Sequence, residues 1–361
     1  MHEQGAVNMR GMRRQAVACL RSRWLQPVSN AISRWYGGVA TSLLYHRVHA
    51  GPPHPSSPPC SGFHPNMNLA VPECRFEEQM RELRSNYHCV ALPDAVAALE
   101  AGELRRGTVT VTFDDGYRDN LLVALPILER YEIPATICIT TGLVDRSAVL
   151  WWDELEFILR HSASLQIDWQ GERHVFRLHT PRDQASAFRT ISQWLKQQAP
   201  DAQRRMLAQL RAQTDAVFSY DQDVLTWDEV RELDRHPLIT LAAHTVNHPA
   251  LAAIDAAAVR REMAQSRARL EQELGHPVPY FAYPYGSEAE AAQREFELCA
   301  AALFRFAVTT RPAHWHPDHR AHLFALPRIM VEYHDTLEDF RFKLSGLDAF
   351  LRQKGRRVVT A

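Results

Sequence analysis

The sequence has no excess of charge of either sign: 41 Lys and Arg stand against 42 Asp and Glu, a formal net charge of −1 at pH 7. Proteins that bind nucleic acid through its phosphates are usually basic, so we expect no nucleic-acid partner. The chain also lacks a long apolar run. The uncharged stretch at residues 236–254 contains three His, two Pro and an Asn, which are costly in lipid, so we predict no transmembrane segment.

We also expect neither a secretory signal nor disulfide-bonded cysteine pairs. The N-terminal region is basic but has no apolar stretch followed by a small-residue cleavage site. The six Cys form no CxxC pair and stand singly, which is typical of reduced thiols. Both features favour a cytoplasmic location. Residues 9–36 suit either a basic amphipathic helix in peripheral contact with a membrane or partner, or a partly ordered extension.

The chain has an ordinary globular composition, with 46% hydrophobic and 23% charged residues, which excludes a mainly disordered or collagen-like protein. Its 361 residues allow about two domains or one large domain with insertions. The 18 His suggest metal binding or acid–base chemistry without establishing either.

Short apolar runs alternate with stretches of helical spacing in two parts of the chain. The β-branched run TVTVTF at 108–113, between Gly107 and Gly116, is the strongest strand prediction. Further strands are expected at 41–48, 87–91, 135–140 and 238–242, and helices at 72–85, 93–101, 121–131 and 255–274. This alternation predicts a parallel α/β core, with a barrel as one form of it.

The alternation is interrupted between the two parts. There we expect a helix at 151–161, a hairpin at 165–179 around Gln170-Gly171, and helices at 182–198 and 200–217. After the core resumes we expect a helix at 287–303 and strands at 306–309 and 323–329. The predicted organisation is a basic extension (1–40), a first core part (41–145), a mostly helical insertion (146–225), a second core part (226–335), and a C-terminal helix and tail (336–361).

Three motifs directly follow predicted strands. Asp114-Asp115 precede Gly116, and carboxylates at the carboxyl end of a parallel strand lie where α/β sheets place active sites; the alternative is a plain turn or helix cap. His244 and His248 share one face if the chain enters a helical turn, which suits a divalent metal; the alternative is two hydrogen-bonding His. Residues 283–286 (YPYG) form either a simple turn or one that points a backbone N–H into a cleft.

Together the motifs provide one carboxylate and two imidazoles for a catalytic metal, with a second carboxylate beside them as a base. On these residues the chain resembles the polysaccharide deacetylases with the NodB homology domain, carbohydrate esterase family 4. TFDDG at 112–116 and HTVNH at 244–248 match the first two family motifs, and YPYG at 283–286 is similar to the third. The resemblance covers about 41–145 and 226–335.

The resemblance implies a distorted or incomplete (β/α) barrel of the NodB type. It implies a metal-dependent hydrolase that removes the acetyl group from an N-acetylated sugar of a polysaccharide or a lipid-linked precursor. Asp114 would be the general base, with Asp115, His244 and His248 as ligands of a divalent metal. Zn²⁺ is the default ion, and other first-row ions suit the same ligands. The metal would polarise the acetamide carbonyl and acidify water, and the Tyr285 backbone N–H would bind the oxyanion.

Two positions depart from the family pattern. The late strand that often carries Leu-x-His reads Leu326-Pro327-Arg328-Ile329 here, whereas Leu44-Tyr45-His46 matches that motif near the N-terminus. We therefore expect a circularly permuted member with His46 as the general acid; the alternative is a structural His in a buried strand. The third motif also lacks its usual Arg, and Arg328 is expected to supply the cation that orients Asp114.

Other conspicuous residues have plainer interpretations. Trp151 and Trp152 suit either stacking on sugar rings or core packing. The Arg-rich helix at 260–269, with Glu262, is expected to be a solvated face. The His cluster at 314–322 is not expected to bind a second metal. Two alternative functions remain: a deacylase acting on a non-sugar linear amide, and a catalytically inactive carbohydrate-binding domain.

Overall fold

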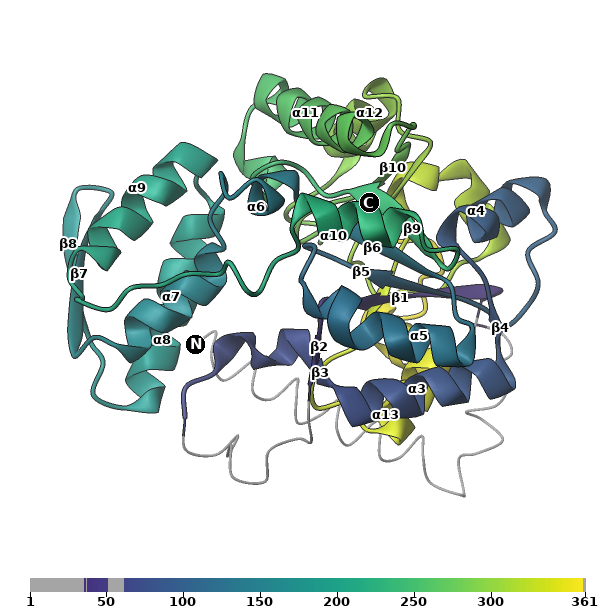
Figure 1. The fold of residues 1–361 in the computed structure, drawn as a ribbon, viewed down its shortest axis with the longest axis horizontal. Helices are drawn as coiled ribbons and strands as arrows, with labels where there is room; N and C mark the ends of the chain where they lie inside the picture. The colour runs from purple at the N-terminus through teal and green to yellow at the C-terminus, as the bar shows by residue number, and fades with distance from the viewer. Residues whose placement is uncertain (1–35, 37, 51–61, 360–361) are drawn as a thin grey trace.

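The computed structural model describes residues 36, 38–50 and 62–359. In this part of the chain, eight parallel strands form one sheet in the order β11-β10-β9-β6-β5-β1-β12, with β4 also paired to β5. The strands are β1 (Ala40–Tyr45), β4 (His88–Cys89), β5 (Thr108–Phe113), β6 (Ala135–Ile139), β9 (Ile239–Ala243), β10 (Tyr280–Ala282), β11 (Phe306–Val308) and β12 (Ile329–Met330). Figure 1 shows the sheet lying between layers of helices.

The central strands are buried along their whole length because helices cover the sheet, as is usual for parallel sheets. β1 and β5 pair in register from Ala40 with Thr108 to Tyr45 with Phe113, so their carboxyl ends lie level. The chain just before β12 also bridges the other end of the strand order, through Leu326 and Val308. The sheet therefore curls toward a closed barrel, which confirms the predicted distorted NodB-type fold.

Helices pack on the outside of this curl. On one side lie α3 (Glu73–Asn86), the π-helical η3 (Asn120–Ala124), α5 (Leu125–Tyr131) and α13 (Leu337–Leu344); elsewhere are α4 (Leu92–Ala101), α6 (Thr141–Val144), α10 (Trp227–Asp234), α11 (Ala256–Leu274), α12 (Gln293–Ala301) and α14 (Leu347–Gln353). The Asp255 carboxylate caps α11 by accepting from the Ala258 N–H, and Gly275 ends it with φ of 76°. The predicted helix at 255–274 is thus confirmed.

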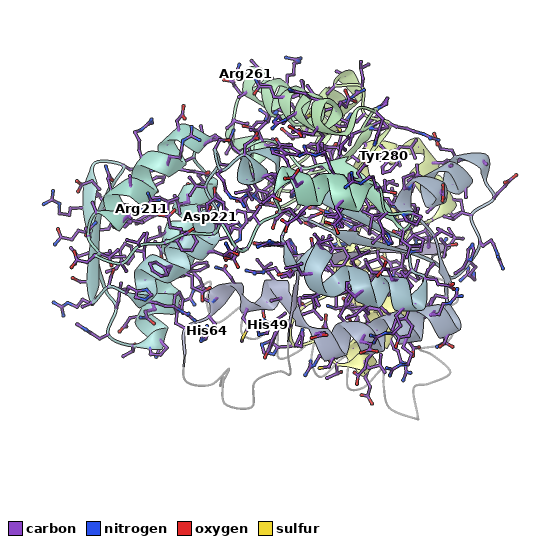
Figure 2. All side chains as sticks on the ribbon, in the orientation of Figure 1. His49, His64, Arg211, Asp221, Arg261 and Tyr280 are labelled. Carbon is purple, nitrogen blue, oxygen red and sulfur yellow. The ribbon has the colours of Figure 1, made fainter. Side chains whose placement is uncertain are left out.

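A lobe of three helices and a hairpin lies beside the barrel, in teal at the left of Figure 1. It consists of α7 (Trp151–Arg160), the antiparallel pair β7 (Ser164–Trp169) and β8 (Glu172–Arg177), α8 (Pro181–Lys196) and α9 (Pro200–Arg211). The predicted hairpin is confirmed, with Gln170 and Gly171 at positive φ in its turn. Figure 2 labels Arg211 of α9, which pairs with the buried Glu154 of α7.

A second, two-stranded pairing lies between the lobe and the helices α3 and α5 (Figure 1). β2 (Arg47–His49) pairs in parallel with β3 (Ala70–Pro72), and the short 3₁₀ helix η2 (Pro65–Leu69) connects into β3. Asn66 of η2 donates to the Trp152 carbonyl oxygen of α7 at 2.8 Å, which joins this segment to the lobe. The lobe is therefore attached to the barrel next to the end of β1.

Several predicted bounds are wrong. Residues 287–292 are not helical, and α12 begins only at Gln293. The strand expected at 323–329 is the 3₁₀ helix η6 (Leu323–Ala325) followed by the two-residue β12, because Pro327 has no N–H to donate to a strand ladder. The helix expected at 200–217 ends at Arg211.

The proposed N-terminal amphipathic helix falls almost wholly outside the described residues, so its membrane contact stays a prediction, as do the bounds of the five predicted segments. Among the helices of the described part of the chain, none is both long and apolar enough to span a membrane.

Candidate active site

The residues that follow β1, β5, β9 and β10 meet at the carboxyl edge of the sheet. His46 follows β1, Asp114 and Asp115 follow β5, and His244 follows β9. Together with residues of the lobe they line a pocket of about 380 Å³. Parallel strands present their carboxyl ends at one edge, so motifs separated by more than 100 residues in sequence converge there.

The three motif loops hold residues in the left-handed backbone region. Asp115 (φ 78°), Thr245 (φ 64°), His248 (φ 53°) and Tyr285 (φ 59°) are all non-glycine residues at positive φ. This conformation is unfavourable for L-residues by about 1–2 kcal/mol each. It persists where the surroundings fix it, and such positions cluster at functional sites.

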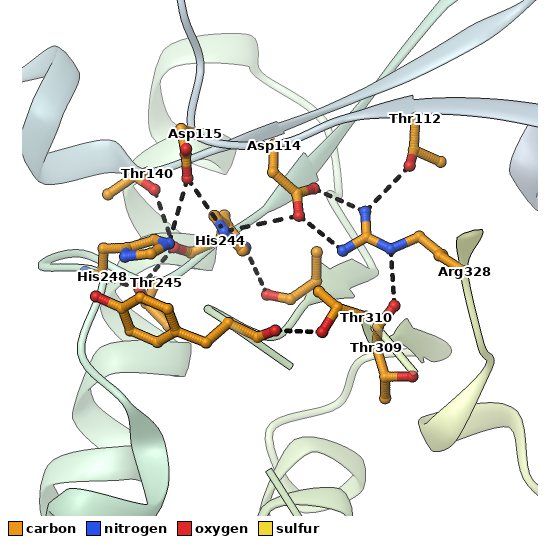
Figure 3. Close-up of polar contacts among 12 residues, drawn as sticks. Thr112, Asp114, Asp115, Thr140, His244, Thr245, His248, Thr309, Thr310 and Arg328 are labelled. Carbon is orange, nitrogen blue, oxygen red and sulfur yellow. Dashed lines mark hydrogen bonds and ion pairs between the residues drawn. The ribbon is translucent and has the colours of Figure 1, made fainter. Parts of the chain in front are cut away.

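Asp115, His244 and His248 form a buried cluster that could hold a metal ion (Figure 3). The Asp115 Oδ1 lies 3.4 Å from His244 Nε2 and 3.2 Å from His248 Nε2. Two ligand atoms about 2.0–2.1 Å from a tetrahedral ion are separated by roughly 3.3 Å, so these spacings suit a first-row divalent metal.

The hydrogen bonds around the cluster leave its inner atoms available. His244 Nδ1 donates to the Ala282 carbonyl at 2.8 Å, so in the neutral ring the lone pair is on Nε2, facing Asp115. The buried Asp115 Oδ1 has no hydrogen-bond partner among the described residues. A lone pair and a carboxylate oxygen facing each other repel unless a proton or a metal ion lies between them, and the donor set fits the implied metal.

Arg328 lies fully buried beside the second carboxylate and binds it with both terminal nitrogens. Its NH1 and NH2 groups each donate to an Asp114 carboxylate oxygen at 2.7 Å, and its Nε donates to the Thr309 carbonyl at 3.0 Å. Burial raises the pKa of the Asp114 carboxyl, but Arg328 and His244 outweigh it, so the pKa lies below its ordinary value. The structure thus brings Arg328 to the position expected for the cation that orients Asp114.

His46 lies at the same pocket and is partly exposed there, while its Nδ1 is enclosed without a hydrogen-bond partner among the described residues. Burial lowers the pKa of its imidazole, and the nearby carboxylates of Asp115 and Asp114 offset this only in part. The placement of His46 at the pocket fits the role suggested by its sequence motif.

Aromatic side chains make the wall of the pocket. The His248 ring packs between Trp152, with centroids 4.8 Å apart, and Tyr285, with centroids 4.7 Å apart. The Trp151 Nε1 donates to the Tyr285 hydroxyl at 3.0 Å, which ties α7 of the lobe to the third motif. Trp151 and Trp152 are buried, which confirms the interpretation as core packing, and they also line the pocket; stacking on sugar rings stays a prediction.

Glu262 of α11 supports the metal cluster from behind, and its role was missed from the sequence. One carboxylate oxygen accepts from the Val246 N–H at 2.8 Å and the Asn247 N–H at 2.9 Å, and the other accepts from the Asn247 side chain at 2.7 Å. The interpretation of this helix as a solvated face is wrong at Glu262, which is only 8% exposed. Glu and Arg alternate along α11, a pattern typical of a solvated helix. This pattern gives no sign that the Glu262 side chain points inward.

Gly142 holds the same loop from the opposite side. Its N–H donates to the Val246 carbonyl at 3.0 Å, and a Cβ at this position would lie 2.4 Å from that oxygen. Only glycine permits this close contact. The loop that carries His244 and His248 is therefore fixed by both α6 and α11.

We expect Glu262→Gln to weaken divalent metal binding about 10- to 100-fold, since outer residues that orient metal ligands typically contribute this much. The amide would place an N–H against one of the backbone donors of the loop. Metal titration monitored by calorimetry measures the effect, with Arg261→Gln as the control because Arg261 is exposed on the outer face of α11 (Figure 2). Equal affinity in the two variants would contradict a supporting role for Glu262.

Comparison with known proteins agrees with this geometry. Residues 101–301, more than half of the chain, match the sequence model of the polysaccharide deacetylase family. The chain belongs to the polysaccharide deacetylase family. The Bacillus subtilis (strain 168) polysaccharide deacetylase YxkH is 25% identical over 126 residues, which cover 34% of this family member and 40% of YxkH. The match thus spans about two fifths of the length of that relative.

Solved structures share the fold of this polysaccharide deacetylase family member at low sequence identity. The Streptococcus pyogenes deacetylase PplD in complex with acetate superposes with a TM-score of 0.56 and 20% identity, covering 84% of this chain and 97% of PplD. IcaB from Ammonifex degensii gives a TM-score of 0.51 and 18% identity, covering 86% of this chain and 97% of IcaB. These likenesses support the barrel fold; the circular permutation stays a prediction.

Proposed function

We propose that this chain is a metal-dependent hydrolase that removes the acetyl group from an N-acetylated sugar of a polysaccharide or its precursor. One observation carries the proposal: the buried ligand cluster of Asp115, His244 and His248 lies directly beside Asp114, which Arg328 holds ionised. Family membership supports deacetylation as the reaction.

In this mechanism the residues of the chain divide the proton transfers between them. Asp115, His244 and His248 would hold a divalent metal, with Zn²⁺ as the default, and the metal would supply Lewis-acid chemistry toward the acetamide carbonyl and the attacking water. The Asp114 carboxylate accepts the proton of that water. His46 then donates a proton to the leaving sugar amine, so that acetate and a free amino sugar are released.

Backbone and aromatic groups complete the site. We assign the Tyr285 N–H to the developing oxyanion, because it donates to no backbone acceptor among the described residues and belongs to a loop at the pocket. Trp151 and Trp152 exclude water from the metal cluster, which strengthens every electrostatic interaction there. A cytoplasmic location and a lipid-linked substrate are part of the same proposal.

The test is release of acetate from N-acetylglucosamine oligomers by the protein loaded with Zn²⁺ or another first-row divalent ion. We expect acetate and free amine in equal amounts, loss of activity on chelation, and recovery when metal is restored. Hydrolysis of small linear amides but not of glycans would favour a non-sugar deacylase instead. Glycan binding without hydrolysis by the metal-loaded protein would favour an inactive binding domain.

The role of His46 gives a separate prediction. His46→Gln is expected to lower kcat about 10²-fold, a typical contribution of a general acid. The pKa of His46 is lowered, and its protonated form is lost as the pH rises through this pKa. Protonation of His46 should therefore set the alkaline limb of the pH profile of kcat. The limb should disappear in the variant. An unchanged kcat across pH would show that His46 is structural.

A further inference from the structure

The lobe contributes a cation to the candidate active site. Phe188, Ser192 and Lys196 of α8 all line the same pocket as the metal cluster. They are four residues apart along the helix and therefore share one face of it. α8 belongs to the segment between the two core parts. Lys196 is therefore not part of any of the three motifs at the strand ends.

Lys196 lies over the ring of Tyr285, with its Nζ 4.5 Å from the ring centroid. Tyr285 packs in turn on His248, so the ammonium is one aromatic ring away from a metal ligand. A cation over an aromatic face is held in place by the ring quadrupole while its N–H groups remain available to another partner.

In the described part of the chain, this ammonium is not neutralised by a direct ion pair. Among the described residues, no carboxylate oxygen lies within 4.0 Å of the Lys196 Nζ. Glu290 also lines the pocket, but it already accepts from the Ser287 hydroxyl. Burial lowers the pKa of Lys196, and Glu290 only partly offsets this. A partly buried cation without a carboxylate partner gains from an anion that enters the pocket.

The charges around the metal cluster also favour an anionic ligand. Arg328 balances the Asp114 carboxylate, and a divalent ion would more than balance Asp115. On the side of the pocket toward the lobe, Lys196 offsets the charge of Glu290, so the net positive charge of the pocket would come from the bound divalent ion.

We propose that Lys196 recognises a negatively charged group, a phosphate or a carboxylate, that the substrate carries on the same sugar as its acetamido group. This proposal rests on the proposed function and narrows its substrate class to anionic N-acetylated glycans. Lys196 would then be a specificity-determining residue supplied by the lobe, with no part in the proton transfers.

The experiment compares three substrates built on one sugar: a neutral methyl N-acetylglucosaminide, its 6-phosphate, and its 6-carboxylate. Initial rates of acetate release give kcat and KM for each. We expect at least one anionic substrate to have a higher kcat/KM than the neutral sugar. The anionic substrate with the higher kcat/KM identifies phosphate or carboxylate as the group that Lys196 recognises.

Lys196→Met should lower kcat/KM for the preferred anionic substrate about 10- to 100-fold relative to the neutral one, the factor typical of hydrogen bonds to charged groups. The change should lie mainly in KM, and Lys196→Arg should keep most of the preference. Arg189→Met is the matched control, because Arg189 is an exposed cation of the same helix outside the pocket. An equal loss on neutral and anionic substrates would overturn the proposal.

A binding measurement separates this proposal from the proposed function. Calorimetry with the corresponding amino sugars, charged and neutral, requires no turnover. If all three bind with the same affinity in the wild type and in Lys196→Met, anion recognition is wrong even when acetate is released. If anion binding depends on Lys196 but none of the N-acetylated substrates is hydrolysed, the deacetylase mechanism fails instead.

Discussion

Replacing His244 and His248 together with alanine is expected to remove stoichiometric divalent metal from the protein and to lower kcat/KM about 10³-fold or more. The metal cluster has one carboxylate and two imidazoles, and Asp115 alone is a weak site for a first-row ion. A Lewis acid contributes several kcal/mol to the transition state of amide hydrolysis, and each 1.36 kcal/mol is a factor of about ten in rate. Elemental analysis of the purified variant and acetate release measure the two losses.

The matched control is the double variant His236→Ala plus His276→Ala. These imidazoles lie near the amino ends of β9 and β10, at the opposite edge of the sheet from the pocket, where they pair with Glu129 and Asp234. The control should retain metal and activity. Full metal content in the His244 and His248 variant, with a folded circular dichroism spectrum, would contradict the assignment of the cluster.

Much of the site could be predicted because its residues follow strands. TFDDG and HTVNH each come directly after an apolar run, and parallel strands end at one edge of a sheet. Their convergence therefore follows from local patterns and topology. Arg328 was also within reach, because the third motif lacks its usual Arg and a buried carboxylate needs a cation.

What could not be predicted depends on contacts between distant segments. Glu262 lies in a helix whose alternating charges are typical of a solvated surface, and only its bonds to Val246 and Asn247 reveal its function. Lys196 reaches the pocket because α7 fixes the lobe against Tyr285 through Trp151. Neither position has a local signal in the sequence, since tertiary packing alone sets which face of each helix turns toward the site.

Asp114→Asn should lower kcat about 10²- to 10⁴-fold while leaving the metal content intact, since Asp115, His244 and His248 are unchanged. The amide cannot accept the proton of water, and it keeps the shape of the carboxylate. In the wild type, the lowered pKa of Asp114 means that the base stays ionised until the pH falls below the ordinary aspartate range. In the pH profile of kcat/KM, the acidic limb should therefore lie at low pH.

The partner of Asp114 tests whether this effect is chemical or structural. Arg328→Met removes both 2.7 Å hydrogen bonds to the carboxylate, so the pKa of Asp114 should rise and the acidic limb should move to higher pH. It also leaves a buried charge without its partner, which should destabilise the fold by about 3–5 kcal/mol, measured by urea unfolding. In the double variant with Asp114→Asn that buried charge is gone, and part of the stability should return. If Asp114→Asn keeps full activity, or if the acidic limb stays in place without Arg328, Asp114 is not the base.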